Sequence, residues 1–138
     1  MVTNKSITDF LFKVHIAILS IGREDNSPHS TPVWYQYESD YTVWFLASKG
    51  TQKSKLLEIG KAVSLVVQTE SDPYQYASIE GHITNISEGD MEKDLRPIAK
   101  RYLGEEGGDE FVASFEEWNS SRYTVAIDKI MTMGISDD

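Results

Sequence analysis

The chain of 138 residues carries 22 acidic and 13 basic side chains, a net charge of -9, and no cysteine, which excludes disulfides and thiolate metal sites. Its length suits a single domain, 1–138, that buries a core of its own. The acidic balance argues against a nucleic-acid-binding protein, and no apolar run approaches the ~20 residues of a membrane span, so we expect a cytoplasmic protein.

The first part of the chain predicts a helix followed by a hairpin. Apolar residues at helical spacing predict a short amphipathic helix over 6–14. Residues 15–21 are apolar on both faces, which is typical of a central strand or of a strand in a closed barrel. A polar turn leads to a second extended segment over 29–37. Pro32 cannot donate to a strand ladder, so it predicts an edge, a bulge or a break there.

The second half predicts two strands, two helices and a last strand. Pro97 either kinks the first of these helices or shifts its start, and the glycine-rich stretch 104–108 predicts a flexible break between the two. Several strands joined by short turns indicate a mainly antiparallel sheet that curls into a small barrel. The predicted strands are 62–69, 77–86 and 123–130, and the helices are 91–103 and 109–118.

Three lysines, Lys49, Lys53 and Lys55, surround a strand-to-helix turn. Aromatic and β-branched residues predict a strand over 41–45, and a helix is predicted over 54–59. Unpaired N–H groups and the helix dipole favour acidic residues at such a start, yet the sequence has none between positions 41 and 57. The composition fits either a docked phosphate group or a solvated helix start with lysines extended along the surface.

Other patterns with a chemical meaning are weak. The three histidines lack metal-ligand spacing, so no metal site is expected. A Gly-x-Ser-x-Gly turn, a phosphate-binding loop and a dinucleotide-binding Gly-x-Gly-x-x-Gly are all missing from the sequence. Many aromatic residues lie in the same half as the basic turn, where they either line a slot for a planar ligand or pack in the core.

Four segments, 25–35, 46–53, 63–67 and 73–81, occur in an order that resembles the pyridoxamine 5'-phosphate oxidase-like superfamily of flavin-binding split barrels. More closely, they resemble its branch of small flavin and deazaflavin (F-420) oxidoreductases. The resemblance implies a mainly β (α+β) fold, a split β-barrel of about six antiparallel strands with peripheral helices. It also implies FMN, or alternatively deazaflavin F-420, bound at the interface of a homodimer.

The same resemblance implies roles for particular residues. The cofactor phosphate would lie on Thr51 and Lys53, with neighbouring residues close by, and the isoalloxazine ring against the backbone of one strand. A loop of the partner subunit would approach the ring. Besides Thr51 and Lys53, the implied cofactor-binding residues are Ala47, Ser48 and Gln52 near the phosphate, Thr31, Pro32, Val33 and Trp34 at the ring, and Tyr74, Gln75 and Tyr76 from the partner.

Two departures bear on function. Many relatives have an arginine where this chain has Gln52, which removes a bidentate phosphate contact. The C-terminal residues 131–138 lack the arginine and histidine with which true pyridoxamine phosphate oxidases hold their substrate, so the resemblance does not extend to vitamin B6 oxidation.

The resemblance therefore implies an enzyme, a flavin-dependent oxidoreductase that transfers hydride to or from a small planar substrate. No catalytic residue is identified; Tyr35, Tyr76 and His29 are the candidate proton donors. A flavin-binding sensor or carrier without turnover, and a haem-binding split barrel, remain open. FMN is favoured over deazaflavin, because the net charge of -9 repels the acidic deazaflavin tail, although Lys49, Lys55 and Lys61 could bind it.

Overall fold

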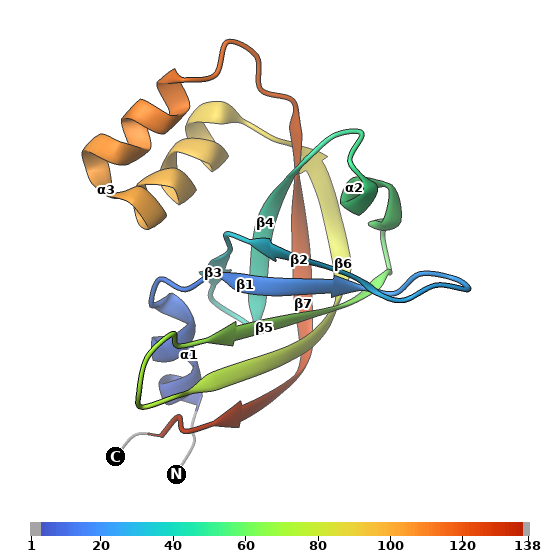
Figure 1. Cartoon of the computed structure of the whole chain (residues 1–138), viewed down its shortest axis with the longest axis vertical. Coiled ribbons are helices and arrows are strands. Elements are labelled where there is room, and N and C mark those ends of the chain that lie inside the picture. Colours follow the sequence, from blue (N-terminus) through green and yellow to red (C-terminus); the bar gives the residue numbers. More distant parts are fainter. Residues whose placement is uncertain (1–3, 137–138) are drawn as a thin grey trace.

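The computed structural model describes residues 4–136; the ends of the predicted domain, 1–3 and 137–138, lie outside the described residues. The strands are β1 (Ala17–Ile21), β2 (His29–Val33), β3 (Gln36–Glu38), β4 (Thr42–Ser48), β5 (Ala62–Gln68), β6 (Tyr76–Glu88) and β7 (Ser120–Met133). The helices are α1 (Asn4–Phe12), α2 (Gln52–Leu56), the π-helical turn η1 (Met91–Leu95) and α3 (Arg96–Ala113) (Figure 1). Within residues 4–136 the strands form one seven-stranded antiparallel sheet in the order β2-β1-β5-β6-β7-β4-β3.

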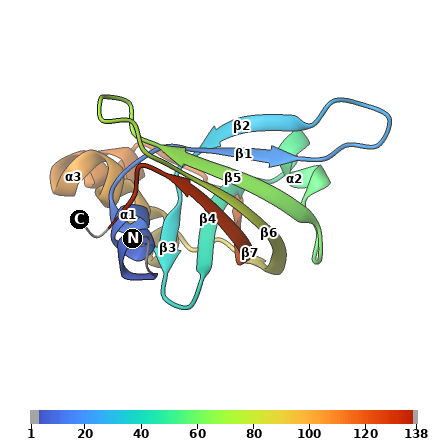
Figure 2. The same ribbon diagram turned by 90° about the horizontal axis from the view of Figure 1, so that it is seen from below.

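The predicted mainly β split-barrel fold is confirmed, although the sheet in the described part of the chain has seven strands rather than about six. The extra strand arises because the extended segment 29–37 is two strands, β2 and β3, which are the two opposite edges of the sheet. Trp34 and Tyr35 alone connect these edges. Since successive Cα atoms are 3.8 Å apart, Val33 and Gln36 lie within about 11 Å of each other. The sheet must therefore curl until the end of β2 lies near the start of β3, although these two edge strands do not pair. Figure 2 shows β3 and β4 lying across from β1 and β2.

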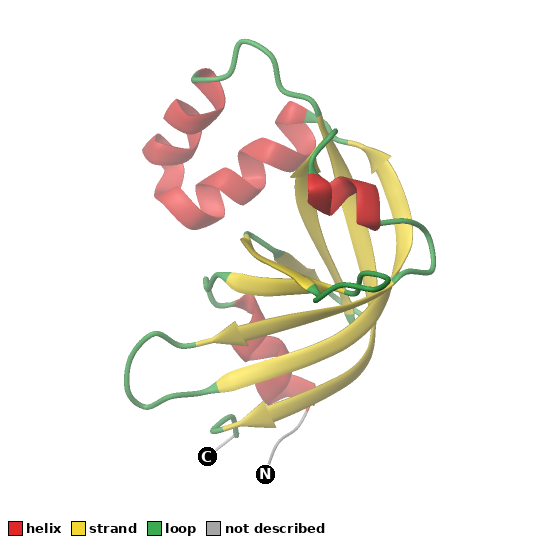
Figure 3. Ribbon diagram, turned by 45° about the vertical axis from the view of Figure 1, so that its right-hand side comes forward, coloured by secondary structure: helices red, strands yellow, loops and turns green. Residues whose placement is uncertain are grey.

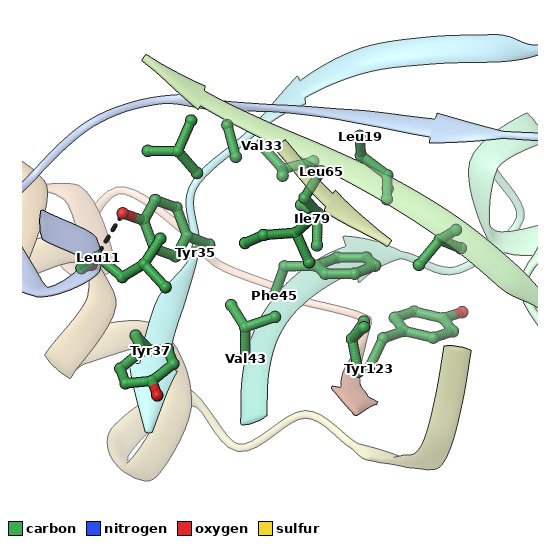
Figure 4. Close-up of a cluster of buried hydrophobic side chains, with 14 of the residues drawn as sticks. Leu11, Leu19, Val33, Tyr35, Tyr37, Val43, Phe45, Leu65, Ile79 and Tyr123 are labelled. Carbon is green, nitrogen blue, oxygen red and sulfur yellow. Dashed lines mark hydrogen bonds between the residues drawn. The ribbon is translucent and has the colours of Figure 1, made fainter. Parts of the chain in front are cut away.

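The barrel interior is filled by alternate residues of the strands. Leu19, Phe45, Leu65 and Ile79 are each 1% exposed or less, and they converge with Tyr123 in Figure 4. The sequence of β1 is apolar on both faces, but only the residues that point into the barrel, Ala17, Leu19 and Ile21, are buried. Ile18 on the outer face is exposed. Pro32 lies in an edge strand, as its missing N–H predicts.

Arg101 of α3 links the connection between β2 and β3 to the end of α1 by hydrogen bonds. Its guanidinium donates to the carbonyl oxygens of Phe12 at 2.8 Å, Lys13 at 3.0 Å and Tyr35 at 3.2 Å. The last carbonyls of a helix have no partner within it and carry partial negative charge, so a cation is favoured there. One side chain thus holds together α1, α3 and the connection between β2 and β3.

Two tyrosine hydroxyls add further hydrogen bonds around the connection between β2 and β3. The hydroxyl of Tyr102 accepts a hydrogen bond from the N–H of Tyr35 at 3.0 Å and donates one to the carbonyl oxygen of His15 at 2.7 Å. The hydroxyl of Tyr35 donates to the carbonyl oxygen of Leu11 at 2.8 Å inside the core (Figure 4). Backbone groups that the open edges leave without ladder partners are satisfied in this way.

The helix α3 is a hairpin of two arms, which Figure 3 shows above one end of the sheet. The reversal falls at Gly104, whose φ of 83° is a left-handed conformation that glycine adopts without strain. Lys100 pairs with Glu105 at 3.0 Å across this bend. Gly108 packs so closely on Lys100 that a Cβ atom there would lie 2.7 Å from the Lys100 backbone nitrogen.

Several predicted helix boundaries need correction. The predicted helix 91–103 forms as η1 and the first arm of α3, with Pro97 in the first turn of α3, where no N–H donor is needed. The predicted helix 109–118 begins earlier, directly after Gly104, and ends at Ala113. The break predicted over 104–108 falls at Gly104, whereas residues 105–108 are helical, and Gly108 allows the two arms to approach.

We expect Arg101→Lys to lower the free energy of unfolding by about 1–3 kcal/mol, because an ammonium cannot bond all the carbonyls that the guanidinium reaches. Urea denaturation followed by circular dichroism measures this loss. Arg23→Lys is the matched control, since Arg23 donates to Ser27 within the β1–β2 turn, and it should cost less than about 0.5 kcal/mol. Equal losses for the two variants would contradict the role assigned to Arg101.

Candidate functional site

A cavity of about 370 Å³ lies between the α3 hairpin and the sheet, a volume within the usual range for small-molecule sites. Its walls are mostly apolar and aromatic, and they come from elements far apart in the sequence. The strands and their flanks contribute Ile16, Pro32, Val33, Trp34, Leu46, Ser48 and Ser120, while the helices and their flanks contribute Lys53, Leu95, Ile98, Phe111, Phe115 and Trp118.

The alternation of β4 places this cavity outside the barrel. Side chains of successive residues point to opposite faces of a strand, so Phe45 and Ala47 fill the interior while Leu46 and Ser48 face α3. Ser48 pairs with Ser120 of β7, and both line the cavity. Ala47, expected near the cofactor phosphate, is only 3% exposed and points into the core.

Stacked aromatic rings form one wall of the cavity. The ring of Trp34 lies parallel to that of Tyr102, with 4.9 Å between centroids and 7° between planes. Phe111 lies 5.4 Å from Trp34, and Phe115 meets Phe111 edge to face at 5.2 Å. Such a wall suits a flat, apolar ligand surface.

The sequence interpretation missed the residues that α3 and its flank bring to this wall. Phe111, Phe115 and Trp118 follow the i, i+4, i+7 spacing of one helix face in the sequence, but only Phe111 lies in the helix, which ends at Ala113. That spacing predicts an apolar face but does not indicate which surface the face covers.

The basic turn has a different local structure from the predicted one. The helix α2 runs from Gln52 to Leu56 rather than over 54–59, with Thr51 as its N-cap. The Thr51 hydroxyl accepts from the Ser54 N–H at 3.2 Å and donates its hydrogen to the Ser48 carbonyl oxygen at 2.9 Å. A helix of five residues has little dipole, and its first turn is also its last. The helix dipole therefore gives little support for a phosphate at this helix start.

Lys53 differs from the other two lysines of the turn. It is half-buried and lines the cavity, and burial lowers the pKa of its ammonium below the ordinary 10.5. Within residues 4–136, no carboxylate lies within ion-pair distance of it. Lys49 instead pairs with Glu88 at 2.5 Å, and Lys55 is exposed. The turn therefore presents one unneutralised cation to the cavity wall.

The other residues implied by the resemblance fall into two groups. Thr31 and Gln52 are sequence neighbours of the cavity residues Pro32 and Lys53, and Thr51 lies two residues before Lys53, but none of the three lines the cavity. Tyr74, Gln75 and Tyr76 lie at the turn between β5 and β6, on the opposite side of the molecule from α2 (Figure 1). Gln75 donates to the carbonyl oxygen of Gly134 at 2.8 Å. None of these three residues lines the cavity of this chain.

Tyr35 is removed from the candidate proton donors. Its hydroxyl is committed to the Leu11 carbonyl, burial raises its pKa above the ordinary value, and it does not line the cavity. Tyr76 and His29 do not line the cavity of this chain either. Across positions 4–136 no three His, Asp or Glu residues gather as metal ligands would, and the helices described there are too short or too polar to cross a membrane.

Residues 3–112 match the family described as pyridoxamine 5'-phosphate oxidase like. No curated protein matches the chain. Among solved structures, an F420 reductase is 17% identical with a TM-score of 0.71, over 89% of this chain and 94% of that chain. General Stress Protein 26 from Bacillus anthracis str. Sterne is 21% identical with a TM-score of 0.68, over 96% and 94%. An FAD binding protein from Mycobacterium smegmatis is 14% identical with a TM-score of 0.64, over 96% of both chains.

These structural likenesses, at such low identity, concern the fold, and they agree with the seven-stranded open barrel found within residues 4–136. The family match covers well over half of the sequence, so the chain belongs to the pyridoxamine 5'-phosphate oxidase-like family.

Proposed function

We propose that this protein binds FMN in the cavity beneath α3 and acts as an oxidoreductase that transfers hydride to or from a small planar substrate. The observation that carries the proposal is a single unpaired lysine, Lys53, at the wall of an aromatic cavity. Proteins of this fold include an F420 reductase and an FAD binding protein, which supports a flavin as the ligand class.

The cavity has side chains suited to both the phosphate and the isoalloxazine ring of FMN. No carboxylate lines it in the described part of the chain, and its polar side chains, Ser48, Lys53 and Ser120, can all donate hydrogen bonds to phosphate oxygens. Trp34 and Phe111 offer ring faces and edges to an isoalloxazine. FMN supplies the hydride chemistry when bound, and the protein orients the ligand and excludes water.

The surroundings of the basic turn favour FMN over deazaflavin. The acidic tail of deazaflavin F-420 would need further cations beyond the phosphate. Lys49, one of the three lysines considered for that role, is neutralised by Glu88. The chain also carries a net charge of -9, which repels a polyanion at long range.

We also propose that the protein is a homodimer formed through the outer face of the sheet. One row of paired residues crosses five strands, from Pro32 through Ile18, Val66 and Ser78 to Met131. Four of these five are apolar, and Ile18 and Met131 remain 40% and 47% exposed. Pro32 belongs both to this row and to the cavity wall, so a second copy docked on the row would reach the edge of the cavity.

A flavin-binding sensor or carrier without turnover is the second candidate. It is favoured by one observation: no histidine, tyrosine or carboxylate lines the cavity within residues 4–136, which leaves Lys53 as its titratable group. The haem-binding alternative loses support from the same observation, because no histidine in that part of the chain faces the cavity.

Turnover distinguishes the two candidates. For an oxidoreductase, we expect the visible absorbance of bound FMN to bleach when NADPH or reduced deazaflavin is added under anaerobic conditions, and to return with an electron acceptor. Absorbance that stays constant with both donors would favour the sensor or carrier. Absence of any FMN binding at micromolar concentration would exclude both.

Lys53→Ala should weaken FMN binding by about 1.5–3 kcal/mol, the weight of a charge-assisted hydrogen bond, and leave riboflavin binding nearly unchanged. Quenching of flavin fluorescence measures both dissociation constants. Lys55→Ala is the matched control, because Lys55 is on the same helix but exposed, and it should change neither. Equal losses for FMN and riboflavin in Lys53→Ala would show that Lys53 does not hold the phosphate.

Ile18→Glu should convert the dimer to a monomer, because it places a charge within the apolar row. Analytical ultracentrifugation at micromolar concentration measures the mass. Ile59→Glu is the control, since Ile59 is 62% exposed but belongs to the turn after α2 rather than to the row. A wild-type protein that sediments as a monomer, or an Ile18→Glu variant that remains dimeric, would exclude this interface.

A further inference from the structure

We propose that Lys53 is a covalent ligand site, at which its side-chain amine forms an imine with a planar aromatic aldehyde held in the cavity beneath α3. This goes beyond flavin binding, because it concerns a bond to the protein itself. The inference rests on three features of Lys53: its place in an aromatic cavity, the lack of a counter-ion, and its contrast with the other lysines.

The surroundings of Lys53 make the loss of a proton from its ammonium easier than it is for an exposed lysine. The side chain is half-buried in a cavity whose other wall residues include Trp34, Phe111, Phe115 and Trp118. Taking an ammonium out of water without a partner is unfavourable, and the lowered pKa of Lys53 has burial as its cause. The neutral amine has the lone pair that attacks a carbonyl carbon, so a desolvated lysine is a better nucleophile near neutral pH.

Other lysines of the chain lack this combination. Lys5, Lys49 and Lys100 each pair with a carboxylate, at 2.7, 2.5 and 3.0 Å respectively, which stabilises the ammonium form. Lys55 lies two residues after Lys53 on α2 but is exposed to water. Lys55 therefore lies on the same helix as Lys53 but does not line the cavity.

The reaction needs no oxidant and no metal ion. The ammonium of Lys53 first releases a proton to water, and the nitrogen lone pair then forms a C–N bond as the carbonyl π bond breaks. A proton shift from nitrogen to the oxygen gives a neutral carbinolamine. Protonation of its hydroxyl lets water leave as the C=N bond forms, giving a protonated imine.

The lining of the cavity selects the aldehyde. Four aromatic side chains, Trp34, Phe111, Phe115 and Trp118, line it, and its volume of about 370 Å³ admits a two-ring aromatic compound. Such a ring system gains contact with the wall before the bond forms. A small polar aldehyde makes no comparable contact, so it should react with lysines according to their exposure.

The experiment labels the full chain after removal of any flavin, so that its outcome does not depend on FMN binding. The protein is incubated at neutral pH with 2-naphthaldehyde or, separately, with glyceraldehyde, and the imines are reduced with cyanoborohydride. Peptide mass spectrometry then gives the extent of labelling at each lysine. Lys53→Arg keeps the charge and removes the reactive amine, and Phe115→Ala opens the aromatic wall while keeping the amine.

With 2-naphthaldehyde we expect at least about tenfold more labelling at Lys53 than at Lys55, which corresponds to about 1.4 kcal/mol. This ratio should fall with glyceraldehyde and in Phe115→Ala, and the Lys53 peptide should carry no label in Lys53→Arg. Unchanged labelling at Lys55, together with a native circular dichroism spectrum, shows that the variants are folded. Equal labelling of Lys53 and Lys55 by 2-naphthaldehyde, or the same ratio for both aldehydes, would overturn the proposal.

Discussion

The chain crosses from one edge of the sheet to the other in two residues, Trp34 and Tyr35, and this crossing connects the fold to the candidate site. Neighbouring residues in an extended chain point to opposite sides. Tyr35 enters the barrel core, where its hydroxyl bonds to Leu11, while Trp34 faces outward and forms the cavity wall. The hydroxyl of Tyr102 accepts the N–H of Tyr35, and its ring stacks on Trp34. The contacts that close the barrel therefore also fix the position of the aromatic wall.

Features set by local chemistry could be predicted from the sequence. Pro32 lacks an N–H, so an edge position follows from its structure alone. The crossing itself could not be predicted, because the segment 29–37 has one continuous extended pattern and only the complete sheet makes its two halves opposite edges. Gly108 resembles a loop residue in sequence, but it is required by the close approach of Lys100 from the other arm of α3. The first error concerns strands at opposite edges of the sheet, and the second a contact between the two arms of one helical hairpin.

In the candidate site, too, local features could be predicted from the sequence, whereas contacts that depend on the complete fold could not. The basic turn stood out in the sequence, but only the family resemblance singled out Lys53. Composition could not separate Lys53 from Lys49, because the carboxylate that neutralises Lys49 belongs to Glu88, 39 residues away. The resemblance also assigned Ala47 to the cofactor, whereas the alternation of β4 turns that side chain into the core. The aromatic wall needed the hairpin of α3, which brings Phe111 to Trp34 across a long stretch of chain.

The two-residue crossing also determines which parts of this protein can vary in length. Inserting one residue between Val33 and Gln36 would reverse the faces, turning an indole towards the core and a phenol towards the cavity. The α3 hairpin has no such restriction, because it packs on the outside of the barrel and reverses at an exposed glycine, Gly104, with open space around it. Changes of length at this reversal, beyond Arg101 and Tyr102, would reshape the cavity and keep the contacts that these two residues make with the barrel. In this architecture, ligand preference can diverge through the hairpin while the crossing keeps a constant length.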